Sequence, residues 1–312
     1  MERTFDQSKN WALILGGSSG MGLASAKKLA SMGLNIFIVH RDRRGAMKSI
    51  QNEFDAIKEQ GVCLETYNGN ALSSDGMQTI LNEVQEKVGN GKIRLLLHSI
   101  ALGNLKLLAP YQPESSTGVA QLAESLGLDS KMIQEKIDHL FEGGAADLVQ
   151  LATPAAYDSS NLNNDEDFNE TIYNMGTNLS SWVRSVFERQ LFAQDARVLG
   201  LTSEGNEVAW RGYAAVAAAK SALESVSRAI AREYAAFGLR CNILQPGITE
   251  TPALRRIPGH LHMMANAIQR NPFRRLTSPE DVANVVALMT LDESSWINGS
   301  IIRVDGGEHI SG

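Results

Sequence analysis

Short apolar runs alternate with longer amphipathic stretches along most of the chain. The run WALIL is followed by GMGLASAKKLAS, whose apolar residues recur at helical spacing, and then by the apolar run NIFIV. Apolar runs of strand length between helical stretches are typical of a parallel sheet with helical crossovers. The runs of this kind are WALILGG, NIFIVHR, VCLETYNGN, IRLLLHSIA, ARVLGLTSE, LRCNILQPG and SIIRVDGG. The pattern therefore predicts an α/β protein, in which residues 1–312 form a single domain around a doubly wound parallel sheet of about seven strands.

One region interrupts the alternation, at about residues 103–170. It is too long for an ordinary connection after the fourth strand, so we expect a helical insertion there. Ser130 is a candidate N-cap, and Gly143 and Gly144 a stop, for a helix with one apolar face. The residues of that face are Met132, Ile133, Ile137, Leu140 and Phe141. Residues 112–170 hold twelve acidic and two basic residues, which predicts an acidic lobe acting as a lid or a subunit contact.

Composition excludes several classes of protein. The chain has 312 residues, a net charge of -6 and no basic run interleaved with aromatic residues, so we expect no nucleic-acid partner. The amino terminus is polar and no apolar run is long enough to span a bilayer, so we expect a cytoplasmic protein without a membrane partner. Cys63 and Cys241 lie inside strand-like runs, which favours buried, reduced thiols. No cluster of His, Cys and carboxylate residues has metal-ligand spacing, so we predict no metal site.

A glycine-rich turn follows the first strand. The segment LILGGSSGMG joins an apolar strand to an amphipathic helix that ends at Gly33. Such glycines allow a sharp turn and let the backbone approach a pyrophosphate at the helix amino end. The alternative is a tight turn that binds nothing, but the strand before it and the helix after it favour a bound dinucleotide. The candidate contacts in this turn are Gly16, Ser18, Ser19, Gly20, Met21 and Gly22.

The end of the second strand bears on which dinucleotide binds. A ribose without a 2′-phosphate usually meets an acid there, whereas a 2′-phosphate needs a cation. His40 occupies this position, and Arg41, Arg43 and Arg44 follow it. NADPH is favoured over NADH, with Arg41 as the candidate contact, although the arginines also fit a solvated surface.

A tyrosine and a lysine lie seven positions apart in RGYAAVAAAKSALESVSRAIAREY. On one helix, Tyr213 and Lys220 share a face and lie about 10 Å apart along the axis. This spacing fits a proton donor working with an ammonium, and it fits an aromatic residue packed beside an alanine-rich helix equally well.

The chain resembles the short-chain dehydrogenase/reductase superfamily over nearly all of its length except about residues 103–170. The residues that carry the resemblance are the turn GGSSGMG, Asn70 and Ala71, Asn178 in TNLSSW, TSE at 202–204, Lys220, PGITET at 246–251, and VDGG. The resemblance implies a Rossmann-type domain that binds NAD or NADP and commonly assembles as a homotetramer; a homodimer is the other expectation.

Two features are similar to the enoyl-[acyl-carrier-protein] reductase branch of this superfamily. Members of the superfamily usually place the tyrosine four residues before the lysine, but Val216 occupies that position and Tyr213 lies seven before Lys220. The fourth strand also ends in HSIA, His98 to Ala101, instead of an asparagine-rich turn. Two features depart from that branch: Ser203 stands where a second tyrosine is common, and the glycine turn is of the ordinary type.

The resemblance implies roles for individual residues. The candidate catalytic residues are Tyr213, Lys220, Ser203 and Asn178. Further cofactor contacts are expected from Asn70, Ala71, Ser99, Ile100, Ala101, Thr202, Lys220, Pro246, Gly247, Ile248 and Thr251. Substrate contacts are expected from Leu102, Tyr213, Leu261, Met263 and Met264, because flexible thioethers suit an acyl chain. For His98 we expect a bond to a strand-end backbone group and no acid-base role.

Three functions remain open on the sequence. The first is NADPH-dependent reduction of a 2-enoyl thioester, carried by an acyl carrier protein or by coenzyme A, in fatty-acid-type metabolism. The second is reduction of a 3-ketoacyl group or another ketone by the same residues. The third is a dinucleotide-binding sensor without turnover, whose acidic insertion is its working surface.

Overall fold

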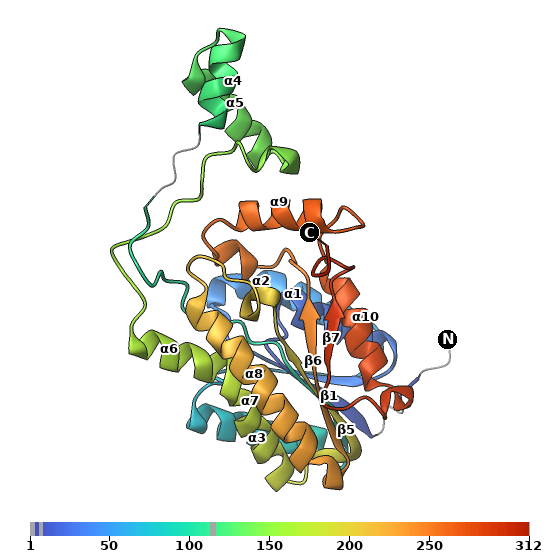
Figure 1. The fold of residues 1–312 in the computed structure, drawn as a ribbon. Coiled ribbons are helices and arrows are strands. Elements are labelled where there is room, and N and C mark those ends of the chain that lie inside the picture. Colours follow the sequence, from blue (N-terminus) through green and yellow to red (C-terminus); the bar gives the residue numbers. More distant parts are fainter. Residues whose placement is uncertain (1–3, 6–8, 113–116, 312) are drawn as a thin grey trace.

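A computed structural model describes residues 4–5, 9–112 and 117–311, which form a seven-stranded parallel sheet (Figure 1). The strand order is β3-β2-β1-β4-β5-β6-β7, so the chain winds outward from β1 in both directions. This confirms the predicted doubly wound α/β fold. The strands are β1 (Asn10–Leu15), β2 (Asn35–His40), β3 (Leu64–Asn68), β4 (Lys92–His98), β5 (Phe192–Leu201), β6 (Leu239–Pro246) and β7 (Ile301–Val304).

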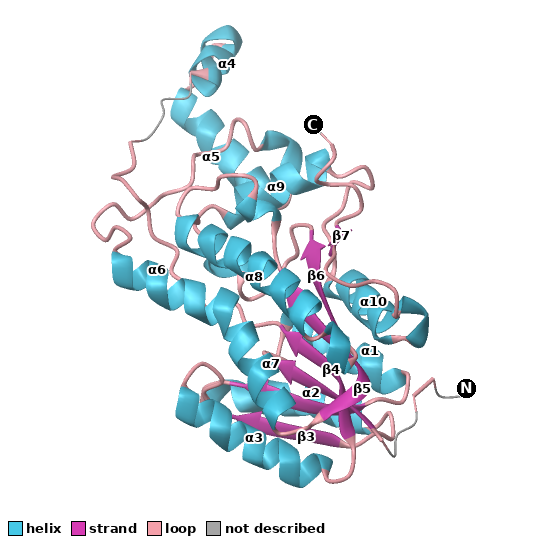
Figure 2. Cartoon of the chain, turned by 60° about the horizontal axis from the view of Figure 1, so that its bottom comes forward, coloured by secondary structure: helices cyan, strands magenta, loops and turns pink. Residues whose placement is uncertain are grey.

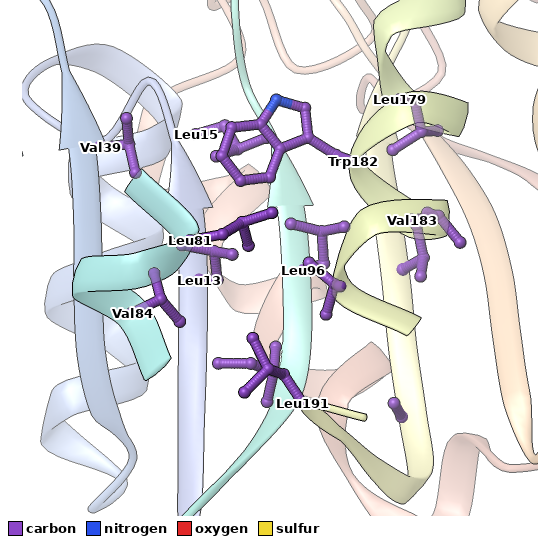
Figure 3. Packing of buried hydrophobic residues seen from close by; sticks show 14 of the residues in the cluster. Leu13, Leu15, Val39, Leu81, Val84, Leu96, Leu179, Trp182, Val183 and Leu191 are labelled. Atoms are coloured by element: carbon purple, nitrogen blue, oxygen red, sulfur yellow. The ribbon is translucent and has the colours of Figure 1, made fainter. Parts of the chain in front are cut away.

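Helices cover both faces of the sheet. The helices are α1 (Gly20–Ser31), α2 (Met47–Lys58), α3 (Ser74–Val88), α4 (Gly118–Leu126), α5 (Ser130–Glu142), α6 (Asp165–Ile172), α7 (Asn178–Glu188), α8 (Ala214–Glu233), α9 (His260–Arg270) and α10 (Pro279–Thr290). On β1, Leu13 and Leu15 face the layer of α3, α7 and α8, whereas Ala12 and Ile14 face the layer of α1, α2 and α10. Figure 3 shows the first of these layers, where Trp182 of α7 packs over Leu15. Burial of both faces explains why the strands are almost continuously apolar.

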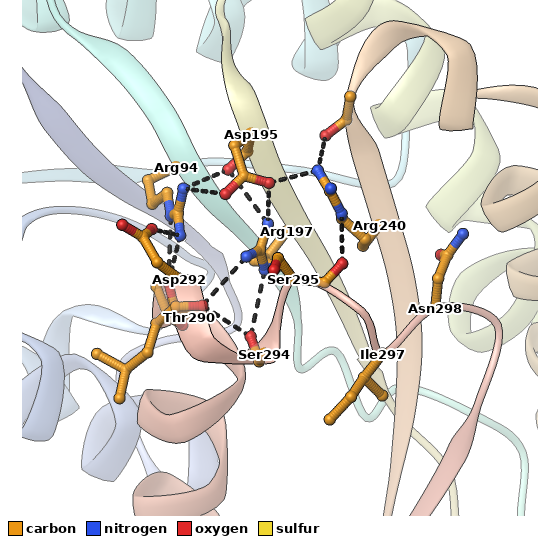
Figure 4. Close-up of polar contacts among 12 residues, drawn as sticks. Arg94, Asp195, Arg197, Arg240, Thr290, Asp292, Ser294, Ser295, Ile297 and Asn298 are labelled. Atoms are coloured by element: carbon orange, nitrogen blue, oxygen red, sulfur yellow. Dashed lines mark hydrogen bonds and ion pairs between the residues drawn. The ribbon is translucent and has the colours of Figure 1, made fainter.

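Three arginines, of which Arg94 and Arg197 are buried, join β4, β5 and β6 away from the carboxyl edge of the sheet (Figure 4). Asp195 of β5 contacts Arg94 of β4 at 2.8 Å, Arg197 of its own strand at 2.5 Å, and Arg240 of β6. Arg94 and Arg197 also donate to the carbonyls of Thr290 and Leu291, at the end of α10 and directly after it. The Asp195 carboxylate thus pairs with three arginines. The bonds from Arg94 and Arg197 to the carbonyls of Thr290 and Leu291 hold the end of α10 against the sheet.

The acidic insertion forms a small lobe that packs on α9. Its apolar cluster comes from α4, α5 and the following 3-10 turn Ala146–Leu148, and it includes Ala265 of α9. The Phe141 ring lies 4.9 Å from the ring of His262, and the Gln269 side chain donates to the Ala146 carbonyl at 2.7 Å. Figures 1 and 2 show the lobe beyond α9, on the side away from the sheet.

Three details of the insertion differ from the sequence predictions. The N-cap of α5 is Asp129, whose carboxylate accepts from the Met132 N–H, and Ser130 is the first helical residue. Met132 and Leu140 are exposed, so the buried face is narrower than predicted. The lobe is also shorter than the predicted insertion, because α6 leaves it and packs along α8.

The cysteines behave differently from each other. Cys241 is buried in β6 as predicted, and burial raises the pKa of its thiol. Cys63 is exposed, contrary to the prediction, because it lies directly before β3 and outside the strand. Its backbone N–H donates to the Asn35 side chain at 3.0 Å. Both thiols are free. None of the described helices has the length and apolar character that a membrane crossing requires.

Candidate active site

A pocket of about 180 Å³ opens at the carboxyl ends of β4, β5 and β6. This is the edge where ligands bind in doubly wound sheets. The lining residues predicted from the sequence are Met21, Ser99, Ile100, Ala101, Leu102, Thr202, Ser203, Tyr213, Lys220, Pro246, Gly247, Ile248, Thr251 and Met263. The structure therefore brings most of the predicted catalytic residues and part of each binding set to one cavity.

Tyr213 lies immediately before α8, where the sequence placed it on the helix. Gly212 has φ +72°, and this left-handed residue turns the chain so that Tyr213 becomes the N-cap of α8. The Tyr213 hydroxyl lies 3.2 Å from Ser203 Oγ. The ring packs closely over Gly205, where an added Cβ would lie 2.4 Å from it. Burial raises the pKa of the Tyr213 hydroxyl, so it keeps its proton at neutral pH.

Lys220 reaches the same pocket from the second turn of α8. Its Nζ donates to the Leu201 carbonyl at 2.7 Å. Burial lowers the pKa of Lys220 to about 8, although the nearby Glu224 carboxylate opposes the shift. Glu224 is held in turn by the Thr202 hydroxyl at 2.6 Å. Lys220 is therefore mostly an ammonium at pH 7 and loses its charge at mildly alkaline pH.

Behind Lys220 lies a buried polar pair, His98 and Asn178. Asn178 begins α7 directly after a π-helical turn, Tyr173–Thr177. Burial and the Lys220 charge lower the pKa of His98 to about 4, and the Asn178 side chain and a backbone group of His98 oppose this shift. Neither His98 Nε2 nor either amide atom of Asn178 makes a hydrogen bond of normal geometry within the described chain. The imidazole is thus neutral at pH 7, and a bond to backbone at His98 itself, the last residue of β4, agrees with the predicted bond at the strand end.

The glycine turn forms a close cradle at the start of α1. An added Cβ at Gly16 would lie 2.7 Å from the Ser99 carbonyl, and one at Gly22 would lie 2.2 Å from the Gly16 carbonyl. Ser19 is the N-cap of α1 but makes no side-chain cap bond. The first amides of α1 therefore keep their donors for an anion, as a pyrophosphate requires. Gly20 lies beside Thr251, which brings the turn next to the loop after β6.

The ends of β2 and β3 lie where the sequence predicted the adenosine part of a dinucleotide to bind. His40 is buried and its Nδ1 lies 2.9 Å from the Asp42 carboxylate, while Arg41 is exposed. Asp42, an acid two residues beyond the strand end, was not among the predicted site residues. The Ala71 carbonyl accepts from the Trp182 indole at 3.0 Å, and Asn70 caps its own turn by accepting from the Leu72 N–H.

Ile248 already has partners for both backbone groups. Its N–H donates to the Glu308 carboxylate at 3.2 Å, and its carbonyl accepts from the Thr277 N–H at 3.2 Å. A nicotinamide carboxamide at this place has to share or replace the Glu308 carboxylate. The sequence did not indicate this contact, because Glu308 lies sixty residues further along the chain.

The side of the pocket next to α9 differs in part from the predicted substrate set. Leu102 and Met263 line it, whereas Leu261 is 39% exposed on α9 and Met264 packs at the edge of the apolar cluster around Met263. Trp210, Leu254 and Ile257 line the pocket and were not predicted. Leu254 and Ile257 are three residues apart, a helical spacing that the sequence offers as a weak signal.

In the described part of the chain, no group of three or more His, Cys, Asp or Glu side chains is placed to hold a metal ion. The polar side chains that line the pocket include those of Tyr213, Ser203 and Lys220.

Comparisons with known proteins agree with this geometry. A family model described as "Enoyl-(Acyl carrier protein) reductase" matches residues 135–309, more than half of the chain, and one described as "short chain dehydrogenase" matches residues 10–124. A 7alpha-hydroxysteroid dehydrogenase of Paraclostridium sordellii is 24% identical over 96% of this chain and 91% of its own length. A probable 2,4-dienoyl-CoA reductase of Bacillus subtilis is 23% identical over 97% of this chain and 98% of its own.

A 3-oxoacyl-[acyl-carrier-protein] reductase of Escherichia coli is 32% identical, but only over 47% of this chain and 59% of its own length. Among solved structures, a promiscuous reductase of lugdunomycin biosynthesis superposes with a TM-score of 0.71 at 18% identity, covering 99% of this chain and all of its own. A dehydrogenase/reductase of Sinorhizobium meliloti gives 0.68 at 19% identity, covering 96% and 94%. At these identities the structures support the fold alone. The family matches, together with the glycine cradle and the strand order, place the chain in the short-chain dehydrogenase/reductase superfamily of NAD(P)-dependent oxidoreductases.

Proposed function

We propose that this chain is an NADPH-dependent reductase of 2-enoyl thioesters. The observation that carries the proposal is the position of Tyr213. This residue directly precedes α8, lines a mostly apolar pocket and lies beside Ser203. In sequence it stands seven residues before Lys220. The dienoyl-CoA reductase relative and the enoyl reductase family model support a carbon-carbon double bond as the target. The pocket lining of Leu102, Leu254 and Ile257 suits an acyl chain.

The chemistry needs a donor at the thioester oxygen. Reduced nicotinamide, when bound, supplies a hydride to the β-carbon, and the electron pair of the double bond moves toward the thioester oxygen. The Tyr213 hydroxyl donates its proton to this oxygen as charge builds there, which gives an enol. The enol then tautomerises: the α-carbon takes a proton from solvent and the oxygen releases its own, which leaves the saturated thioester. The Lys220 ammonium stabilises the phenolate that remains, until solvent returns the proton. Ser203 holds the Tyr213 hydroxyl in place and offers a second donor to the oxygen.

We propose NADPH as the preferred dinucleotide. Arg41 is exposed at the end of β2, where it can meet a 2′-phosphate, and the neighbouring acid, Asp42, is engaged with His40. NADH is the alternative. A comparison of kcat/KM with the two dinucleotides decides between them, and Arg41→Ala lowers the NADPH value selectively if the proposal is right.

The position of Arg256 supports the proposal that the acyl group is carried on phosphopantetheine, as part of coenzyme A or of an acyl carrier protein. It is exposed at the rim of the pocket, directly beside the lining residues Leu254 and Ile257. Other arginines in this region are engaged: Arg255 with Glu250, Arg270 with Glu204, and Arg275 with Asp281. Arg256 is therefore well placed at the entrance to meet a carrier phosphate.

A carbonyl reductase remains the second candidate. The contact between Ser203 and Tyr213 favours it, because two donors side by side also suit a ketone oxygen, and one relative is named as a 3-oxoacyl reductase. Purified protein with NADPH and either crotonyl or acetoacetyl thioester separates the two, followed by the absorbance of the reduced nicotinamide. Oxidation of NADPH with the keto substrate alone rejects the enoyl proposal. Binding of NADPH without turnover of either substrate favours a sensor. Cytoplasmic location and a homotetramer or homodimer stay predictions from the sequence.

A further inference from the structure

Helix α9 covers the acyl side of the pocket and is itself covered by the acidic lobe. Met263 lines the pocket and packs in one cluster with Leu254 and Ile257, with Tyr213 at its edge. Ala265, on another face of α9, belongs to the apolar cluster of the lobe. The position of α9 therefore sets the shape of the acyl side, although α9 contributes no polar group to the reacting atoms.

The Arg270 guanidinium, at the end of α9, joins this helix to the segment after β5, which carries Ser203, and through Glu308 to the loop after β6, which carries Ile248. Nη2 of Arg270 contacts the Glu204 carboxylate and lies 3.0 Å from the Glu308 carboxylate. Glu204 directly follows Ser203, and its side chain is only 6% exposed. Glu308 is 1% exposed, and its carboxylate also accepts from the Ile248 N–H and packs against Gly247.

These contacts connect four segments that are distant in sequence: the end of β5, the loop after β6, helix α9 and the segment after β7 that carries Glu308. The two buried carboxylates share this one cation as their close ion-pair partner. His309 Nδ1 lies 3.6 Å from Glu204, too far for a hydrogen bond. Burial and the Glu204 charge raise the pKa of Glu308, and the Arg270 pairing opposes the shift. Removal of the guanidinium would leave two facing carboxylates without their cation.

We propose that Arg270 is a positioning residue for the acyl substrate: by pairing with Glu204 and Glu308 at once, it holds α9 over the pocket in register with Ser203 and Ile248. This inference rests on the proposed function for the site but not on the choice between an enoyl and a keto substrate. Without the guanidinium, α9 stays anchored to the C-terminal segment by the Asn271 side chain, which donates to the Asp305 carbonyl at 2.9 Å. The cover then loosens over Ser203 while the fold persists.

The test uses Arg270→Met and a matched control, Arg189→Met. Arg189 is likewise partly buried and joins two elements, donating to Asn82 and Gln78 of α3, but it lies away from the pocket. In Arg270→Met we expect KM for the thioester to rise at least about tenfold, with kcat within about threefold and the dissociation constant of NADPH within about twofold. Amide hydrogen exchange in residues 260–270 is expected to be about tenfold faster, while exchange in α10 is unchanged. Arg189→Met leaves KM and the exchange of α9 as in the wild type.

A double variant separates positioning from loss of stability. Arg270→Met/Glu308→Gln removes one of the two unpaired charges, so we expect Tm to recover while KM and α9 exchange stay raised. Recovery of KM together with Tm would overturn the proposal, as would an unchanged KM in folded Arg270→Met. If only the keto substrate turns over, KM is measured with that substrate. If neither turns over, the proposed function fails separately, and unchanged exchange of α9 in Arg270→Met then overturns the positioning role by itself.

Discussion

Replacement of Tyr213 by Phe removes one oxygen from the proposed reaction centre and little else. The hydroxyl has one described partner, Ser203 at 3.2 Å, and the ring is held by Gly205 and the cluster of Leu254, Ile257 and Met263. Loss of a hydrogen bond of this kind costs about 1 kcal/mol of stability, so we expect the variant to fold and the ring to stay in place. Loss of a donor to the developing oxyanion costs about 10²–10³ in kcat, equivalent to about 3–4 kcal/mol.

The assay follows oxidation of NADPH by crotonyl thioester at saturating cofactor, and nucleotide binding is measured separately. We expect kcat to fall by about 10²–10³ while the dissociation constant of NADPH changes less than about twofold. Tyr157→Phe is the control, because this ring packs on Tyr111 at the base of the insertion and does not line the pocket. A Tyr213→Phe variant that keeps its rate within about threefold would refute the proton-donor role.

Three further outcomes follow from the structure. Since the mechanism needs the Lys220 ammonium and its pKa is lowered to about 8, we expect kcat to fall about tenfold per pH unit above pH 8, and a level profile between pH 7 and 10 contradicts this role. The pKa of His98 is lowered from 6.5 to about 4, so between these pH values the unfolded chain binds a proton at His98 that the folded chain does not. We therefore expect the free energy of unfolding, measured in urea, to fall as the pH drops through this window, by up to about 1.4 kcal/mol per pH unit. His98→Asn is expected to remove this contribution to the pH dependence. Asp195→Asn weakens the ion pairs with Arg94 and Arg197, and we expect the free energy of unfolding to fall by about 2 kcal/mol. This is less than the roughly 3–5 kcal/mol typical of a fully buried pair, because the Asp195 side chain is 35% exposed. An unchanged Tm would contradict a stabilising role for these ion pairs.

The sheet and the candidate residues at the centre of the site could be predicted from the sequence because their signals are local. Apolar runs of strand length, a glycine turn and a seven-residue spacing each lie within a short window of the chain. Parallel strands bring their carboxyl ends together, and Ser203, Tyr213 and Lys220 line one pocket there. The seven-residue spacing alone did not distinguish a proton donor from a packing residue, so the roles of these residues were predicted from the family resemblance.

The rest depends on contacts between distant segments. Arg270 meets Glu204 across 66 residues and Glu308 across 38, and nothing in the residues near Arg270 distinguishes it from the other arginines of that region. The burial of Cys63 was predicted wrongly because an apolar run does not say where the ladder begins. The cap of α5 was misplaced by one residue because Asp129 and Ser130 are both good N-cap residues, and only the bond to Met132 decides between them.

The most direct test of the central claim is a competition between substrates. Protein is mixed with equal amounts of crotonyl and acetoacetyl thioester and with NADPH that carries deuterium in both C4 positions of the nicotinamide, and the early products are identified by mass spectrometry. The ratio of products gives the ratio of kcat/KM directly. We expect butyryl thioester labelled at C3 to exceed the 3-hydroxybutyryl product by about 100-fold or more. A predominance of labelled 3-hydroxybutyryl thioester would show that Tyr213 serves a ketone oxygen instead.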